Sequence, residues 1–245
     1  MFIYSYEEGF TCLSLIYSNL VIPITLDKRV KGPRTPPAPD LTDFQKEVIF
    51  GTMLGDLTAE RSQKTGNTRL RFYMSSINKD LIYHLYSIFK SYVKTEPKFI
   101  NRKLNKLTNI EHTDIYFSTL KYPMFNWVYD DFYVKNENKN IKIIPKDSIN
   151  SLTSISLAYW IMDDGSFNKG KGYLILCTDS YSREEVLHLI DILKNKFNLS
   201  AALVSIKKKN KNFYYRVRVN KSSMPHLIEL VKPYIIPSMV YKLGL

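Results

Sequence analysis

The chain has 245 residues and carries 35 Lys or Arg against 23 Asp or Glu, which gives a formal net charge of +12. Two cysteines exclude a disulfide framework, and no apolar run reaches the ~18 residues that a membrane-spanning helix needs. The excess of positive charge favours a polyanionic partner such as nucleic acid; an anionic membrane surface is disfavoured because the basic residues recur at strand spacing.

Residues 1–40 differ in composition from the rest of the chain. Residues 28–40 contain four prolines, which predicts an extended linker without a packed core. We therefore interpret residues 1–40 as an N-terminal extension and linker. A regular apolar pattern starts at Leu41, and it divides into two successive units that we place at 41–150 and 151–245.

The first unit begins with a predicted helix. Thr42 and Gln45 have capping-box spacing, and apolar residues follow at helical intervals until Gly55-Asp56. The elements predicted after this helix are, in chain order, an alternating strand at 69–74, a helix capped by Asn78 that runs to about Val93, a hairpin over 97–118 and a short aromatic helix near 125–132.

The second unit repeats this order. Its first helix is capped by Thr153 and ends at Asp164-Gly165. The elements predicted after it are a strand at 173–178, a helix that starts with the capping box of Ser182 and Glu185, a hairpin over about 201–219 and a last helix near 223–232. An internal repeat of this kind predicts an α+β fold of two αββαββα units related by a pseudo-twofold axis. Each unit would supply a four-stranded antiparallel sheet, and the two sheets would form a saddle for DNA.

The helices that open the two units end in similar sequences. The first reads Ile-Phe-Gly-Thr-Met-Leu-Gly-Asp from 49 to 56, and the second Leu-Ala-Tyr-Trp-Ile-Met-Asp-Asp-Gly from 157 to 165. Gly51 and Gly55 would let the two helices approach closely, whereas Tyr159 and Trp160 predict an asymmetric seam. A single Gly-Asp helix end is usually only a cap, but two in matching repeats, each followed by a basic strand, favour a catalytic site.

These residues resemble the LAGLIDADG homing endonucleases, especially the single-chain members that carry two motifs, and the resemblance covers residues 41 to 245. It implies a site-specific endonuclease that cuts double-stranded DNA at a long asymmetric site and acts as a monomeric pseudo-dimer. It also implies an organellar location, in the mitochondrion. It also implies that Asp56 and Asp164 meet and bind Mg²⁺, which prefers hard oxygen ligands. The roles that it implies for other residues are backbone carbonyl ligands from Gly55 and Asp163 and active-site lysines at Lys142 and Lys242.

Basic side chains on the exposed sheet faces are the predicted DNA contacts. Alternation such as that of Arg216 and Arg218 with Val217 and Val219 predicts one basic face and one core face. A β-ribbon of this kind fits the major groove, where Arg reads guanine. The predicted set is Arg61, Lys64, Arg69, Arg71, Lys98, Arg102, Lys103, Lys169, Lys171, Lys207, Lys209, Arg216 and Arg218.

Two other functions fit parts of this pattern. An RNA maturase, which would bind its host intron RNA and assist splicing, could use the same fold and charge, alone or together with DNA cleavage. Retention of both Asp56 and Asp164 favours the nuclease, because a protein that only binds has no need of paired carboxylates. A repressor-like DNA-binding module is disfavoured because no helix-turn-helix is evident.

Overall fold

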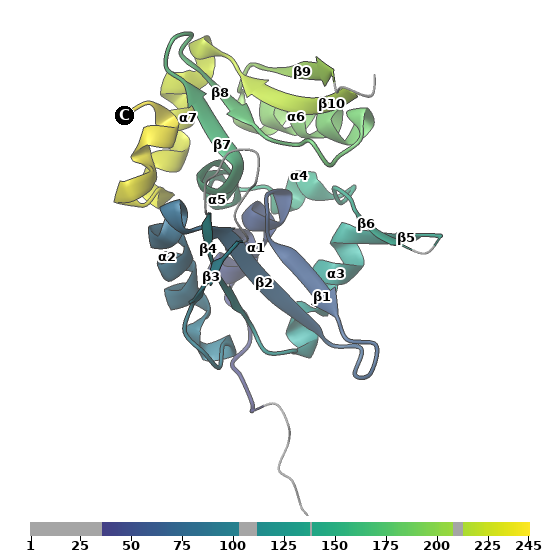
Figure 1. Cartoon of the computed structure of the whole chain (residues 1–245). Coiled ribbons are helices and arrows are strands. Elements are labelled where there is room, and N and C mark those ends of the chain that lie inside the picture. The colour runs from purple at the N-terminus through teal and green to yellow at the C-terminus, as the bar shows by residue number, and fades with distance from the viewer. Residues whose placement is uncertain (1–35, 103–111, 138, 208–212) are drawn as a thin grey trace, which may run out of the picture. The chain divides into compact units, whose positions relative to one another are not determined.

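The computed structural model describes residues 36–102, 112–137, 139–207 and 213–245. The chain from Pro37 to Leu245 forms one compact unit. Within this unit, two groups of helices and strands follow one another in the same order, each around its own sheet (Figure 1). None of the described helices is long and apolar enough to span a bilayer.

The first group has four strands and three main helices. The strands pair antiparallel in the order β1-β2-β4-β3. The bounds of its elements are α1 Asp43–Leu54, β1 Thr58–Arg61, β2 Thr68–Ser75, α2 Lys79–Phe89, β3 Lys98–Asn101, β4 Thr113–Ser118 and α3 Asn126–Phe132.

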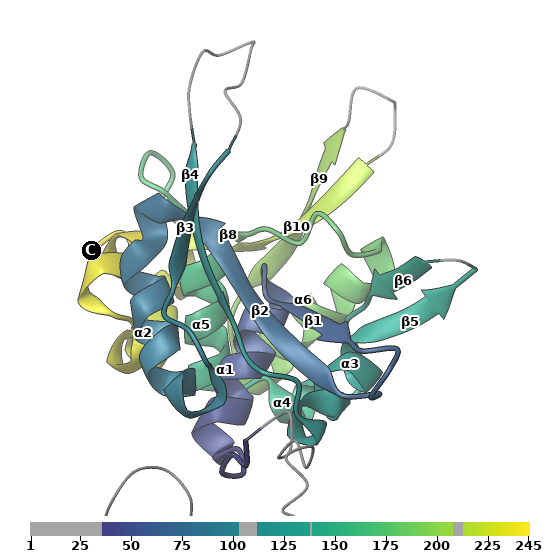
Figure 2. The same cartoon turned by 60° about the horizontal axis from the view of Figure 1, so that its bottom comes forward.

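The second group repeats this topology, with the strand order β7-β8-β10-β9. Its elements are α5 Ser154–Asp164, β7 Gly165–Asn168, β8 Tyr173–Leu176, α6 Arg183–Phe197, β9 Ala201–Lys207, β10 Phe213–Val219 and α7 Met224–Val231. The duplicated α+β fold with two four-stranded antiparallel sheets is therefore confirmed. In Figure 2 the far ends of β3–β4 and of β9–β10 extend to the same side of the unit.

The helix starts follow the predicted capping pattern with one exception. Thr42 and Ser182 both form complete capping boxes, and the Thr153 hydroxyl accepts a hydrogen bond from the backbone N–H of Ser156. Asn78 is the N-cap residue of α2, as predicted, but it does not cap the helix through its side chain. A 3-10 turn at Ser76–Asn78 already leads the backbone into α2, and the Asn78 side chain makes no capping hydrogen bond.

A two-stranded hairpin between the two groups was not predicted. It consists of β5 Tyr133–Asn136 and β6 Lys139–Lys142, and the short helix α4 Ser148–Ser151 follows it. The strands are rich in Lys and Asn, and they lack the β-branched alternation on which a strand prediction depends. The predicted boundary between residues 150 and 151 falls inside α4, and the domain limits stay a prediction.

The seam between the two groups is formed by α1 and α5, which pack directly against each other. At Gly51 an added Cβ would lie 2.1 Å from the backbone oxygen of Ser156, so only glycine permits this approach. The bulky Tyr159 packs edge-on against Phe44 of α1. Its hydroxyl is hydrogen-bonded to His84 Nε2 on α2 at 2.7 Å, and the two rings stack. The expected asymmetry therefore arises because the aromatic side chain of α5 packs toward α2.

Candidate active site

The two motif carboxylates follow the C-terminal ends of the seam helices. Helix α1 ends at Leu54, and Gly55 turns the chain so that Asp56 lies beyond the helix and is exposed. Helix α5 continues two residues further by comparison, because Asp164 is its last residue and Gly165 is the cap. Each carboxylate then leads directly into the first strand of its sheet. The two connections from helix to strand differ in conformation, but both place their aspartate, Asp56 or Asp164, at one end of the seam.

Contacts across the seam bring these two helix ends together. The backbone N–H of Asp56 donates a hydrogen bond to Asp163 Oδ2 at 2.7 Å. A Cβ added to Gly55 would lie 2.3 Å from that same oxygen, so the glycine leaves room for the Asp163 carboxylate. The motif pattern predicts a role only for the backbone carbonyl of Asp163. The sequence does contain one indication of a role for the Asp163 side chain. The matching residue of the other motif is Gly55, which has no side chain and so leaves space for a larger residue opposite it.

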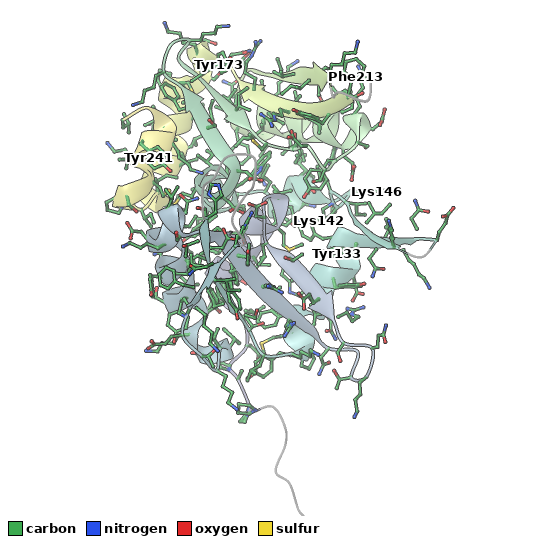
Figure 3. All side chains as sticks on the ribbon, in the orientation of Figure 1. Tyr133, Lys142, Lys146, Tyr173, Phe213 and Tyr241 are labelled. Atoms are coloured by element: carbon green, nitrogen blue, oxygen red, sulfur yellow. The ribbon has the colours of Figure 1, made fainter. Side chains whose placement is uncertain are left out.

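Lys142 and Lys242 reach the same region from unrelated elements. Lys142 Nζ donates to the carbonyl oxygens of Gly55 at 2.6 Å and Leu57 at 2.9 Å. Lys242 Nζ donates to the carbonyl oxygen of Asp163 at 2.9 Å, and the Lys242 side chain is buried. Each lysine thus contacts the motif of its own repeat. In Figure 3, Lys142 lies where β6 returns toward the seam, on the same side as Tyr133.

Burial dominates the protonation of this cluster. It raises the pKa of Asp164 and of Asp163, and the neighbouring carboxylates raise both further. Burial also lowers the pKa of Lys142 to about 8 and lowers that of Lys242, although the nearby Asp163 and Asp164 act in the opposite direction. These pKa shifts mean that two carboxyl groups and two lysines are held close together with little water. Such clusters of ionisable groups are frequent in functional sites.

The oxygen atoms at the helix ends fit a hard divalent cation. Asp56 and Asp164 supply carboxylates, and Gly55 and Asp163 supply carbonyl oxygens that the two lysines contact. Among the described residues no group of three or more His, Cys, Asp and Glu side chains is arranged to hold a metal. A cation here would therefore take its remaining ligands from carbonyl oxygens, water and a bound phosphate, as Mg²⁺ commonly does.

The raised pKa of Asp164 predicts how the stability of the metal-free protein depends on pH. Between its usual pKa near ~3.9 and its raised folded-state value, the folded form binds more protons, so stability falls as pH rises through that window. We expect Asp164→Asn to unfold at a higher temperature than the wild type at pH 8 in EDTA, by about 2–4 °C for each kcal/mol recovered. Thermal unfolding at pH 4 and pH 8 checks this, and an equal difference at both values would contradict it.

The exposed face of the first sheet has a hollow next to Asp56. Arg69, Arg71 and Tyr73 alternate along β2 with buried Leu70 and Phe72, so they share this face. The hollow has a volume of about 440 Å³, and its lining residues are Asp56, Thr58, Glu60, Arg71, Tyr73 and Arg102. A pocket of about 490 Å³ lies near the start of α1, but it contains none of the predicted site residues.

Acidic residues hold several arginines of the first sheet in place. Arg69 donates two hydrogen bonds to Glu60 Oε2, at 2.6 and 2.8 Å. Arg102 pairs with Asp114, which also accepts a hydrogen bond from the Tyr73 hydroxyl. These two contacts lower the pKa of Asp114 against the effect of burial. The guanidinium groups are thus oriented on the exposed face before any ligand binds.

The second sheet has the same kind of surface. Arg216 forms two hydrogen bonds of 2.6 Å with Asp179, and Arg218 Nε donates to the Asn220 side chain at 3.1 Å. Their guanidinium groups also lie over the rings of Tyr214 and Tyr173. Other predicted DNA contacts are exposed at sheet edges or turns, namely Lys64, Lys98, Lys169 and Lys171.

Not every predicted DNA contact lies on these faces. Arg61 is paired with Thr68 on the helix side of the first sheet, where it donates to Asp130 at 2.5 Å and packs over Tyr129 of α3. Lys207 is paired with Phe213, on the side of the second sheet that faces the helices, although it is exposed. Alternation of residue types along a strand predicts that the strand has two faces, but it does not show which face the helices cover. Lys103 and Lys209 lie outside the described residues.

The duplicated αββαββα architecture, with a carboxylate at the end of each seam helix, defines a two-motif LAGLIDADG protein. A profile described as the LAGLIDADG DNA endonuclease family matches residues 46–227, and the chain belongs to this family.

The chain is similar to maturases and to DNA endonucleases, as three examples show. Cytochrome b mRNA maturase bI2 of Saccharomyces cerevisiae is 40% identical over 201 residues, which make up 80% of this chain but only 46% of that protein. The chain thus spans about half the length of this relative. DNA endonuclease I-ChuI of Chlamydomonas applanata is 29% identical over 214 residues, or 83% of this chain and 96% of that protein. The structure of the homing endonuclease I-WcaI bound to its DNA recognition sequence has 32% identity and a TM-score of 0.73, and the match covers 84% of this chain and 88% of that one.

Proposed function

We propose that this protein is a site-specific endonuclease that hydrolyses phosphodiester bonds of double-stranded DNA with Mg²⁺ held by Asp56 and Asp164. The observation that carries the proposal is the meeting of two motif ends, joined by the hydrogen bond from Asp56 to Asp163, beside two sheets with basic exposed faces. The similarity to I-WcaI, which binds a DNA recognition sequence, supports the choice of DNA as the partner.

The residues of the site would divide the work of hydrolysis. Bound Mg²⁺ would supply Lewis-acid stabilisation of the phosphate and a water of lowered pKa. Asp56 and Asp164, with the carbonyl oxygens of Gly55 and Asp163, would hold the cation. Lys142 and Lys242 would then be free to turn toward the phosphate and stabilise the negative charge that develops there. The lowered pKa of Lys142, about 8, would also let this lysine exchange a proton near neutral pH.

The sheets would supply affinity and sequence preference. Lysines at sheet edges and turns would bind phosphates and set the position of the protein, while arginines on the sheet faces would read bases in the major groove. The two sheets carry different side chains, so the site should be asymmetric and long enough for both. The proposed contacts on these faces, edges and turns are Lys64, Arg69, Arg71, Lys98, Arg102, Lys169, Lys171, Arg216 and Arg218.

Intron RNA is a second candidate partner. The similarity to cytochrome b mRNA maturase bI2 favours it, and two such proteins, from Saccharomyces cerevisiae and Debaryomyces hansenii, match this chain at 40% and 34% identity. The same relatives support an organellar, mitochondrial location. Both motif carboxylates are present here, which favours cleavage, alone or together with maturation. With both motifs in one chain, the active form would be a monomer.

Incubation of the purified protein with a library of randomised double-stranded DNA tests the proposal. We expect cleavage at a defined set of long sites in Mg²⁺ and binding without cleavage in Ca²⁺, because the two cations differ in geometry and in their hold on water. A splicing assay with the host intron runs in parallel. Splicing rescue without cleavage of any library member would overturn the endonuclease proposal in favour of the maturase.

A further inference from the structure

We propose that the Asp163 side chain is a positioning residue that acts on the half of the active site containing Asp56, so that its loss slows the cutting of one DNA strand more than that of the other. This inference rests on the proposed endonuclease function. Comparison of the two motifs gives no role to the Asp163 side chain, because the matching residue of the first motif is Gly55.

The two motif aspartates have different backbone support. Asp164 is the last residue of α5, so its N–H lies within the helix. Asp56 lies two residues beyond the end of α1, and its N–H bonds across the seam although those of Gly55 and Leu57 bond back to Thr52. Asp163 Oδ2 accepts that N–H at 2.7 Å from across the seam. The N–H of Asp56 in the first repeat therefore needs an acceptor from the second repeat, whereas the N–H of Asp164 lies within its own helix.

The contact cannot be reciprocal. Gly55 occupies the matching position and has no side chain with which to reach the second repeat. It also provides the space that Asp163 fills, because a Cβ at Gly55 would lie 2.3 Å from Asp163 Oδ2. The glycine and the aspartate therefore form one asymmetric, complementary pair.

The position of the Asp56 carboxylate depends on this backbone contact. Asp56 is exposed, and within the described part of the chain no side chain is hydrogen-bonded to its carboxylate. Its backbone must therefore set its direction. A shift of about 1 Å in a catalytic group can slow a reaction about 100-fold. Loss of the Asp163 contact would thus affect the Asp56 half more than the half around Asp164.

Strand-resolved kinetics of Asp163 variants test the inference. A supercoiled plasmid with one target site is cut under single-turnover conditions, and a linear substrate with a different label on each strand gives the two rates. In Asp163→Ala we expect one strand to be slowed about 10- to 100-fold more than the other, so that nicked circles accumulate. Asp163→Asn keeps an acceptor oxygen for the Asp56 N–H, and it should bring the ratio of the two strand rates back toward that of the wild type.

Several outcomes would overturn the proposal. Equal slowing of both strands in Asp163→Ala would indicate a general structural or charge effect, and so would identical ratios in the Ala and Asn variants. Binding in Ca²⁺ and thermal unfolding show whether each variant is folded; if Asp163→Ala is not, Asp163→Leu removes the acceptor while keeping similar volume. A wild-type protein that cuts no DNA would instead refute the endonuclease function itself, which separates the two failures.

Discussion

Replacement of Asp164 by asparagine is expected to reduce the single-turnover rate of DNA cleavage by at least about 1000-fold, because it would remove a charged ligand of the cation in the proposed site. The change is nearly isosteric, and it eliminates a carboxylate whose burial and neighbours raise its pKa. Affinity for the target in Ca²⁺ should change less than about threefold, since the arginines and lysines on the sheets are the proposed phosphate contacts. Rates are measured with saturating enzyme, and binding by titration of labelled DNA.

A matched variant separates this effect from a general loss of charge. Asp191 lies exposed on α6, remote in sequence from both motifs, and Asp191→Asn makes the same chemical change there. It should cleave within about twofold of the wild type, because surface substitutions away from functional features have small effects. If Asp164→Asn also retained cleavage within tenfold, Asp164 could not be a ligand of the catalytic cation.

The meeting of the two motif ends could be predicted because each end is encoded by a short segment and the segment occurs twice. A capped helix, glycines four residues apart and a carboxylate at the helix end are all features of short segments, and Gly51 and Asp56 follow that pattern. The capping box at Ser182 was equally local, and the structure confirms it. Repetition then supplied what a single segment lacks, because matching motifs in two units imply that their ends meet.

Other features depend on partners distant in sequence and were not predicted. Arg61 has the composition of a DNA contact, but its pairing with Thr68 turns it toward Asp130 of α3. The hairpin at 133–142 begins with Tyr133, whose hydroxyl accepts a hydrogen bond from the backbone N–H of Ala59. Neither contact leaves a local pattern. The side chain of Asp163 was missed for the same reason, since its partner is a backbone N–H in the other repeat.

Replacement of Gly51 by alanine is expected to lower the free energy of unfolding by about 3–5 kcal/mol. Alanine normally stabilises a helix interior by about 0.5–1 kcal/mol relative to glycine, so the expected sign is opposite to that of helix propensity. The reason is the seam. The new Cβ would lie 2.1 Å from the Ser156 oxygen and 2.9 Å from its backbone carbon, and backbone atoms of α5 can yield only if the two helices separate. Denaturant unfolding measures the change.

Gly170 provides the matched control for this prediction. It lies in the turn between β7 and β8, and a Cβ there would meet nothing closer than the Asn168 side-chain oxygen at 3.6 Å. Gly170→Ala should therefore stay within about 0.5 kcal/mol of the wild type. Separation of the seam would also pull Asp56 away from Asp163, so Gly51→Ala should lose cleavage even at temperatures where it remains folded. A Gly51→Ala protein as stable as the control would mean that α1 and α5 do not pack at this distance, and the paired carboxylates would lose their structural basis.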